Sequence, residues 1–319
     1  MKVLRNVSFV CLTLCFLFSC GNKAKNSAAK NDANPEANEQ PPNIVFILSD
    51  DQSWTDYSFM GDENIETPRL DKFASESLTF TKGYVPTSLC SPSLATIITG
   101  QYPKNHGILG NDVVYKREED PKDSRNNRTE AYKPIIPHFE KLTTLPDLLK
   151  DKGYLSFQTG KWWHGNYKIG GFDYGMTHGD PNRGGRHGDY GLEIGRKGLD
   201  TINSYLNLAL KEKKPFFLWY APFLPHKPHT PPQRLYEKYK KKTDSEYLAK
   251  YWAMCEWFDE TCGELFDLID DKGLTENTLF VYVCDNGWVQ DPEKSGYMKE
   301  SKRAPYDLGM RTPIMYKWA

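Results

Sequence analysis

Continuous apolar runs recur along the chain from residue 43 onward. The first run, residues 43–49 (NIVFILS), is followed at once by two aspartates. Such a run is typical of a strand that is buried on both faces of a parallel sheet. Three further runs have the same character, at residues 154–158, 216–221 and 279–284. The pattern therefore predicts four buried strands.

Segments with apolar residues at helical spacing separate these runs. They cover residues 67–77, 92–99, 144–152 and about 245–271. Strands that alternate with helices predict an α/β domain, with a mostly parallel central sheet flanked by helices. We expect this domain to extend over residues 43–319.

The first nineteen residues have the pattern of an export signal. Lys2 and Arg5 precede a short apolar run at residues 7–19, which is shorter than the ~20 residues of a membrane-spanning helix. The run ends in LFSCG, which resembles a bacterial lipobox with Cys20 as the lipidated residue. We predict a lipoprotein signal peptide at residues 1–19; the alternative is an ordinary cleaved signal peptide that happens to contain Cys20.

The next segment, residues 20–42, is small, polar and contains proline, without apolar periodicity. Such a sequence buries too little apolar surface to offset the entropy of ordering it, and this predicts a flexible tether. The expected protein is thus exported and attached to a membrane by lipid, either in the periplasm or at the cell surface.

Composition and charge argue against some classes of function and of structural framework. The chain has 319 residues and a formal net charge of -1. A near-neutral balance argues against nucleic acid as a partner, because a phosphate backbone requires a concentrated basic surface. The cysteines of the expected domain show neither a disulfide framework nor the spacing of a zinc site.

Two of the predicted strands end in pairs of oxygen donors. Asp50 and Asp51 follow the first strand, and Asp285 and Asn286 follow the last. The carboxyl ends of parallel strands meet at one edge of a sheet, where ligands collect. Carboxylate and amide oxygens suit a hard divalent cation, so the sequence predicts a calcium or magnesium site.

A cysteine lies where the second predicted helix begins. Cys90 stands two residues before Pro92, which is favoured in a first helical turn. A group at this place feels the positive end of the helix dipole. The residues alone leave three alternatives open: a reactive thiolate, an anion site, or a thiol buried under the start of the helix.

Several motifs, in order along the chain, resemble those of the type I, formylglycine-dependent sulfatases, which belong to the alkaline-phosphatase-like superfamily. The motifs lie at residues 45–52 (VFILSDDQ), 90–93 (CSPS) with 99–107 (TGQYPKNHG), 160–165 (GKWWHG), 284–288 (CDNGW) and 302–313 (KRAPYDLGMRTP). Five motifs in the family's order are a specific signal.

The resemblance implies a role for each candidate residue. Cys90 would be oxidised to formylglycine by a maturase, and the hydrate of formylglycine would attack sulfur. Ca²⁺, with Mg²⁺ as an alternative, would be bound by Asp50, Asp51, Asp285, Asn286 and the residue derived from Cys90. Lys161, Lys302 and His229 would bind the substrate, a sulfated carbohydrate.

Two histidines have implied roles in proton transfer. His164 would assist proton removal at the nucleophile. His229 would protonate the leaving alcohol, with His226 as the alternative in the same segment, residues 225–232 (PHKPHTPP). The loop at residues 180–191 (DPNRGGRHGDYG) offers Arg183, Arg186 and His187 to an acidic substrate, although a solvated glycine-rich loop is the favoured interpretation.

The chain departs from the family pattern at two points. Leu94 stands where the family's motif usually has arginine, part of what the maturing enzymes recognise. The chain also ends at residue 319, where family members continue into a smaller C-terminal subdomain, so we expect an incomplete domain.

The alternatives to an active sulfatase are a silent glycan-binding lipoprotein with unconverted Cys90, and a phosphatase or phosphonate ester hydrolase of the same superfamily.

Overall fold

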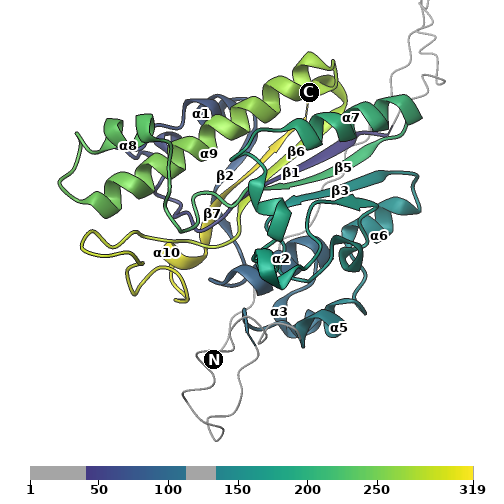
Figure 1. The fold of residues 1–319 in the computed structure, drawn as a ribbon, viewed down its shortest axis with the longest axis horizontal. Helices are drawn as coiled ribbons and strands as arrows, with labels where there is room; N and C mark the ends of the chain where they lie inside the picture. Colours follow the sequence, from purple (N-terminus) through teal and green to yellow (C-terminus); the bar gives the residue numbers. More distant parts are fainter. Residues whose placement is uncertain (1–40, 113–133, 319) are drawn as a thin grey trace, which may run out of the picture. The chain divides into compact units, whose positions relative to one another are not determined.

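The computed structural model describes residues 41–112 and 134–318. The predicted signal peptide, Cys20 and all but the last two residues of the predicted tether lie outside the described residues. Within the described part, the chain forms a seven-stranded sheet in the order β2-β7-β6-β1-β5-β3-β4 (Figure 1). No helix in these two ranges is both long enough and apolar enough to cross a membrane.

The strands pair mostly in parallel, as the sequence predicted. The strands are β1 (Asn43–Ser49), β2 (Leu78–Tyr84), β3 (Leu155–Gly160), β4 (Tyr174–Gly175), β5 (Phe216–Ala221), β6 (Thr278–Cys284) and β7 (Arg311–Lys317). Strand β1 lies between β5 and β6 and is parallel to both, and β3 is parallel to β5 and β4. Strand β7 is antiparallel to β6 and to β2, which forms one edge.

The four predicted helices are confirmed within a few residues. The helices are α1 (Pro68–Ser75), α2 (Cys90–Thr99), α3 (Pro103–His106), α5 (Ile135–Phe139), α6 (Leu145–Lys150), α7 (Asp200–Glu212), α8 (Gln233–Tyr239), α9 (Glu246–Asp271) and α10 (Asp307–Met310). Local signals fix the start of two of them. Ser245 accepts the N–H of Leu248 at 3.2 Å to cap α9, and Thr144 and Asp147 form a capping box for α6.

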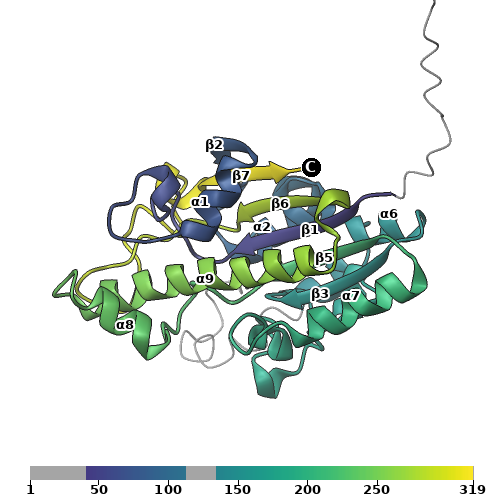
Figure 2. The same cartoon turned by 90° about the horizontal axis from the view of Figure 1, so that it is seen from above.

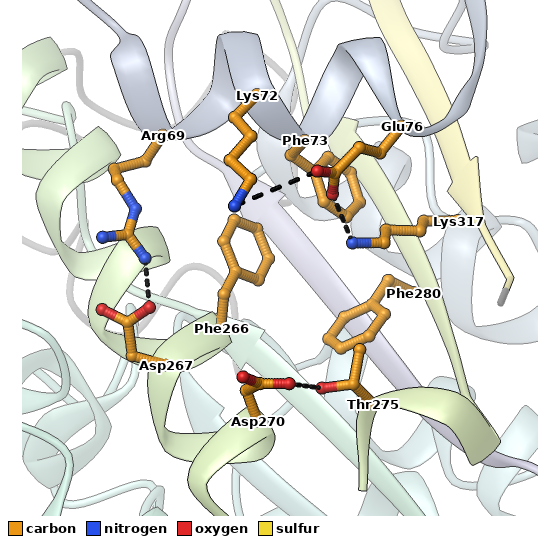
Figure 3. Close-up of a pocket in the computed structure, with 10 residues that line it drawn as sticks. All are labelled: Arg69, Lys72, Phe73, Glu76, Phe266, Asp267, Asp270, Thr275, Phe280 and Lys317. Carbon is orange, nitrogen blue, oxygen red and sulfur yellow. Dashed lines mark hydrogen bonds and ion pairs between the residues drawn. The ribbon is translucent and has the colours of Figure 1, made fainter. Parts of the chain in front are cut away.

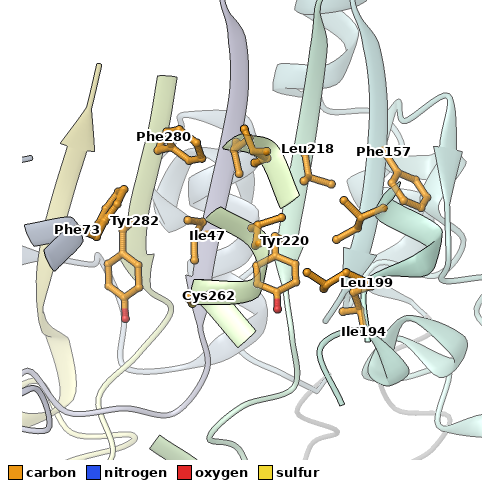
Figure 4. Close-up of a cluster of buried hydrophobic side chains, with 14 of the residues drawn as sticks. Ile47, Phe73, Phe157, Ile194, Leu199, Leu218, Tyr220, Cys262, Phe280 and Tyr282 are labelled. Carbon is orange, nitrogen blue, oxygen red and sulfur yellow. The ribbon is translucent and has the colours of Figure 1, made fainter. Parts of the chain in front are cut away.

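The sheet is buried between two layers of helices, which lie on opposite sides of it in Figure 2. Side chains of β1 alternate between the two faces: Val45 and Ile47 join one apolar cluster, and Leu48 joins the other. The first cluster packs against α1, α7 and α9 (Figure 4). The second packs against α2, α5 and α6. Burial on both faces explains why the central strands are continuous apolar runs.

The domain begins slightly before the predicted boundary. The carbonyl oxygen of Pro42 accepts a hydrogen bond from the Tyr154 hydroxyl at 2.7 Å, and that of Pro41 accepts one from Asn277 at 3.4 Å. These two prolines, which we assigned to the tether, therefore lie against the domain.

Candidate active site

The predicted oxygen donors come together at the carboxyl ends of β1 and β6. The register places Ser49 opposite Cys284, so the residues that follow each strand are neighbours. The backbone N–H of Asp51 donates to Asp285 Oδ1 at 3.2 Å, and Asn286 Nδ2 donates to Asp51 Oδ1 at 2.7 Å. Asp51 has φ 62°, a left-handed conformation that costs a non-glycine residue energy and is typical of functional turns.

Lys161 follows β3 directly and crosses to these carboxylates. Its ammonium is paired with Asp50 and lies 3.3 Å from Asp285 Oδ2. All three side chains are at least 97% buried. Its position depends on the sheet, because β3 pairs with β5 and the Lys161 N–H continues the ladder to the carbonyl of Ala221 at 2.6 Å.

Cys90 is the first residue of α2 and faces the same carboxylates. Its Sγ atom lies 4.0 Å from Asp51 Oδ1 and 3.4 Å from the ammonium of Lys302. Lys302 also donates to both carboxylate oxygens of Asp51, at 2.5 and 2.6 Å. The backbone N–H of Arg303 donates to the carbonyl of Ser88 at 3.0 Å, which ties this segment to the turn before α2.

The two histidines of the segment after β5 occupy different places. His226 Nε2 lies 3.3 Å from Asp51 Oδ2. His229 lies farther out, with its ring 5.4 Å from that of Tyr251 and 6.0 Å from that of Trp288. Both line an open pocket of about 530 Å³, together with His187, Lys227, Pro228, Tyr247, Lys250 and Ser295. The alternative residue, His226, is therefore the histidine beside the carboxylates.

Burial governs the protonation of this cluster. It raises the pKa of the Cys90 thiol to about 12, so the residue is a protonated thiol at neutral pH and a poor nucleophile in that form. Burial also raises the pKa of Asp51, but Lys302 and His226 outweigh it and hold that pKa below its ordinary value. Asp285 and Asp50 likewise outweigh the effect of burial on Lys161 and hold its pKa well above the ordinary one.

The donor set fits a divalent cation. Ligand atoms of Asp50, Asp51, Cys90 and His226 lie within 4.8 Å of one another. Among the described residues, Asp50 Oδ2 and Asn286 Oδ1 are buried without a hydrogen-bond partner. Buried carboxylate oxygens require positive charge nearby, and burial raises the pKa of Asp50 well above its usual range despite Lys161. Oxygen-rich surroundings of this kind suit Ca²⁺ or Mg²⁺.

His164 is not among the residues that the structure brings together here. Its ring is fully buried and stacks on Phe139 at 3.8 Å between centroids, with Trp162 edge-on at 5.1 Å. Neither ring nitrogen has a hydrogen-bond partner in the described part of the chain, and burial lowers the pKa of the ring to about 3. The sequence assigned His164 a proton-transfer role beside Cys90, whereas the structure gives it the surroundings of a core aromatic residue.

Replacing His164 by phenylalanine tests this placement. A phenyl ring preserves the stacking on Phe139 and has no unpaired nitrogens, so we expect the free energy of unfolding to change by less than about 1.5 kcal/mol. We also expect kcat/KM for a sulfate ester to stay within a few-fold of the wild type. Chemical denaturation and steady-state kinetics measure the two quantities, and a large loss of activity in a stable variant would return His164 to the site.

The structure shows how two features noted in the sequence are buried. Leu94, at the family's usual arginine position, is 1% exposed and packs in the apolar cluster around α2. The loop at residues 180–191 is not simply solvated: Asp189 is buried, and the His187 ring lies 5.8 Å from that of His226. Burial, with Lys161, lowers the pKa of His187 to about 3. The sequence offered His187 of this loop to an acidic substrate, but it favoured a solvated loop, because the sequence pattern does not reveal which side chain faces inward.

A second pocket lies elsewhere, between α1, α9 and the ends of β6 and β7 (Figure 3). Most of its charged side chains are paired, including Arg69 with Asp267 and Lys317 with Glu76. Phe280, in the first half of β6, lines it. The pocket thus does not lie at the carboxyl ends of the parallel strands β1 and β6, where ligands collect in such sheets.

The decisive comparison is with families of known proteins. The family described as Sulfatase matches residues 42–319. The chain belongs to the sulfatase family. The match starts at the contacts of Pro42 described above and includes every residue of the cluster around Asp51. The resemblance of the five motifs is therefore confirmed.

Individual sulfatases are similar over most of the chain. Human N-acetylgalactosamine-6-sulfatase is 29% identical, over 88% of this chain and 57% of its own length. An ulvan-active sulfatase of Formosa agariphila is 26% identical, over 95% of this chain and 60% of its own. The crystal structure of Ps i-CgsB shares the fold, with a TM-score of 0.65, 24% identity and coverage of 88% and 66%. The chain thus spans about three-fifths of the length of the curated relatives.

Proposed function

We propose that this sulfatase-family chain hydrolyses sulfate esters of glycans, with a nucleophile derived from Cys90 and a divalent cation. One observation carries the proposal: Cys90 begins α2 within 4.0 Å of Asp51 and 3.4 Å of Lys302, inside the cluster of buried carboxylates. A buried, protonated thiol has little use there as a cysteine. Oxidation of Cys90 to formylglycine by a maturase, followed by addition of water to the aldehyde, would supply the hydroxyl of a gem-diol as nucleophile at this same place.

The side chains around Cys90 would hold the negative charge of a sulfate ester. Lys302, between Cys90 and Asp51, would bind a sulfate oxygen and the nucleophile's oxygen by charge-assisted hydrogen bonds. Lys161 would do so from the side of Asp50. In a buried site, such fixed positive groups stabilise developing charge more strongly than they would in water.

The cation would be held by Asp50, Asp51, Asp285 and Asn286, with the residue derived from Cys90. Ca²⁺ is the proposed ion and Mg²⁺ the alternative, because the ligands are oxygens on two rigid strand ends. When bound, the ion would supply positive charge that polarises the sulfate ester. The two unpartnered oxygens, on Asp50 and Asn286, are the support for this set.

Of the two histidines after β5, we assign the leaving-group proton to His226. The support is its place, 3.3 Å from Asp51 and grouped with Cys90. His229, farther along the wall of the same pocket, would contact the sugar instead. The sequence analysis preferred His229 for this role and kept His226 as the alternative. A proton donor must lie within hydrogen-bond reach of the reacting oxygen, and of the two residues His226 is nearer to the nucleophile.

The substrate class is proposed as sulfated carbohydrate. One relative is by name a sulfatase of N-acetylgalactosamine 6-sulfate, and another is by name active on ulvan. The open pocket beside His226 has room for a sugar ring. The proposed location is the periplasm or cell surface, with lipid on Cys20 as anchor and a formylglycine-generating maturase as partner.

Matched aryl esters test the proposal. The full chain, produced in cells that contain a formylglycine-generating maturase and supplied with Ca²⁺, is assayed on an aryl sulfate and on the aryl phosphate with the same leaving group. We expect the sulfate to have the higher kcat/KM. A higher value for the phosphate would favour the phosphatase alternative, and release from neither ester would contradict the proposal.

A silent glycan-binding lipoprotein remains the second candidate, and Leu94 favours it. Leucine at the family's usual arginine position removes a group that maturing enzymes recognise, and the side chain is buried in the core. If the protein is a silent glycan binder, we expect it to bind a sulfated glycan without releasing sulfate, even when a control sulfatase is converted in the same cells.

A further inference from the structure

The loop at residues 180–191 is held firmly against the end of β3. The buried carboxylate of Asp189 accepts backbone N–H groups of His178 at 2.8 Å, Asp180 at 2.9 Å and Tyr190 at 2.6 Å. A Cβ atom on Gly188 or Gly191 would approach the carbonyl oxygen of Gly160 within 2.5 Å, so only glycine permits this contact. The loop is therefore built onto the residue that precedes Lys161.

His187 is the residue that this arrangement presents to the pocket. Its carbonyl oxygen accepts the N–H of Trp162 at 2.9 Å. Its ring lies 4.9 Å from that of Trp163, 5.5 Å from that of Phe223 and 5.8 Å from that of His226. It lines the same pocket as His226 and His229. The pocket thus has histidines from two separate segments of the chain.

Trp163, which contacts the His187 ring, is held in place by its other neighbours as well. The guanidinium of Arg186 pairs with Asp112 and lies 4.5 Å from the centre of the Trp163 ring. Trp163 therefore contacts both Arg186 and His187, while the next residue, His164, turns away to stack on Phe139. The segment after Lys161 thus directs a tryptophan toward the loop, and the loop supplies the imidazole.

We propose that His187 contacts the substrate directly, by a hydrogen bond from its ring to an oxygen of the sulfate group beside His226. It is a further residue of the active site, from a loop for which the sequence favoured a solvated interpretation. The inference rests on the proposed function, because it names a contact of the same site. A rigid loop anchored to the neighbour of Lys161 holds the ring without a conformational change on binding.

Sulfate binding and turnover test this contact together. His187→Asn is compared with His178→Asn, an exposed histidine of the same loop region whose ring faces Tyr190 and not the pocket. Calorimetric titration with inorganic sulfate measures binding, and an aryl sulfate measures kcat/KM. We expect His187→Asn to lower both by about 10- to 100-fold and His178→Asn to change them less than about two-fold.

Thermal unfolding separates a contact from a role in folding. We expect both variants to melt within a few degrees of the wild type, because Asp189 and the glycines hold the loop. Wild-type sulfate affinity in a stable His187→Asn variant would overturn the inference, as would a loss that accompanies a large fall in melting temperature. A wild-type chain that binds sulfate but releases none would count against the proposed function alone, since the binding comparison needs no turnover.

Discussion

We expect Cys90→Ala to remove sulfate ester turnover almost completely, with a fall in kcat of at least about 10⁴-fold in protein from a maturing host. The physical reason is that alanine cannot be converted to formylglycine. The variant would therefore lack the hydroxyl, beside Lys302 and Asp51, that attacks sulfur in the proposed reaction. The Cys90 Sγ atom contacts both of these groups, at 4.0 Å from Asp51 Oδ1 and 3.4 Å from the Lys302 ammonium. Steady-state kinetics on an aryl sulfate measure the loss.

A matched cysteine separates chemistry from packing. Cys262, on α9, is also fully buried, but it lies in the cluster on the other face of the sheet. Cys262→Ala loses a core contact and is expected to lower the free energy of unfolding without changing kcat. If Cys90→Ala kept more than a tenth of the wild-type turnover, Cys90 would not be the source of the nucleophile.

We expect Asp51→Asn to abolish the stabilisation of the chain that the proposed Ca²⁺ site would provide. In the wild type, Ca²⁺ at about one hundred times its dissociation constant should raise the free energy of unfolding by about 2.7 kcal/mol. Asp51 lies at the centre of the site. Its carboxylate accepts hydrogen bonds from Lys302 and Asn286, and its backbone N–H donates to the carboxylate of Asp285. Its amide analogue loses the charge that attracts the cation. Thermal or denaturant unfolding, with chelator and with Ca²⁺, measures the difference.

The control is another buried carboxylate. Asp259, on α9, accepts the backbone N–H groups of Leu70 at 2.7 Å and Arg69 at 3.1 Å, at the start of α1. Asp259→Asn should lower stability overall, but the increment produced by Ca²⁺ should remain. An equal increment in Asp51→Asn and in the wild type would show that the cation binds elsewhere.

The strands and helices that carry the site were readable from the sequence because each has a strong local pattern. Residues 43–49 and 216–221 match β1 and β5 to the residue, since burial on both faces requires continuous apolar runs. Strand β2 was missed. It is an edge strand in antiparallel pairing whose side chains are largely exposed, and its sequence, LTFTKGY, contains no continuous apolar run. The short helix α8 lacks a pattern long enough to detect.

The site was predictable where it depends on strand ends. Asp50, Asp51, Asp285 and Asn286 meet because parallel neighbours end at one edge of the sheet, whatever the loops do. His164 and His187 show where prediction of the site from the sequence fails. A shift of one residue after β3 decides which side chain faces Phe139 and which faces the loop, and the place of His187 depends on glycine contacts with Gly160. Neither is encoded in local spacing.

The most direct test of the account is the chemical state of Cys90. Mass spectrometry measures this state in protein from a native or closely related host. The tryptic peptide from residues 83–104 contains Cys90 and no internal lysine or arginine. We expect the mass of formylglycine at Cys90. Unmodified cysteine alone, with a control sulfatase converted in the same cells, would contradict an active sulfatase and favour the silent glycan binder.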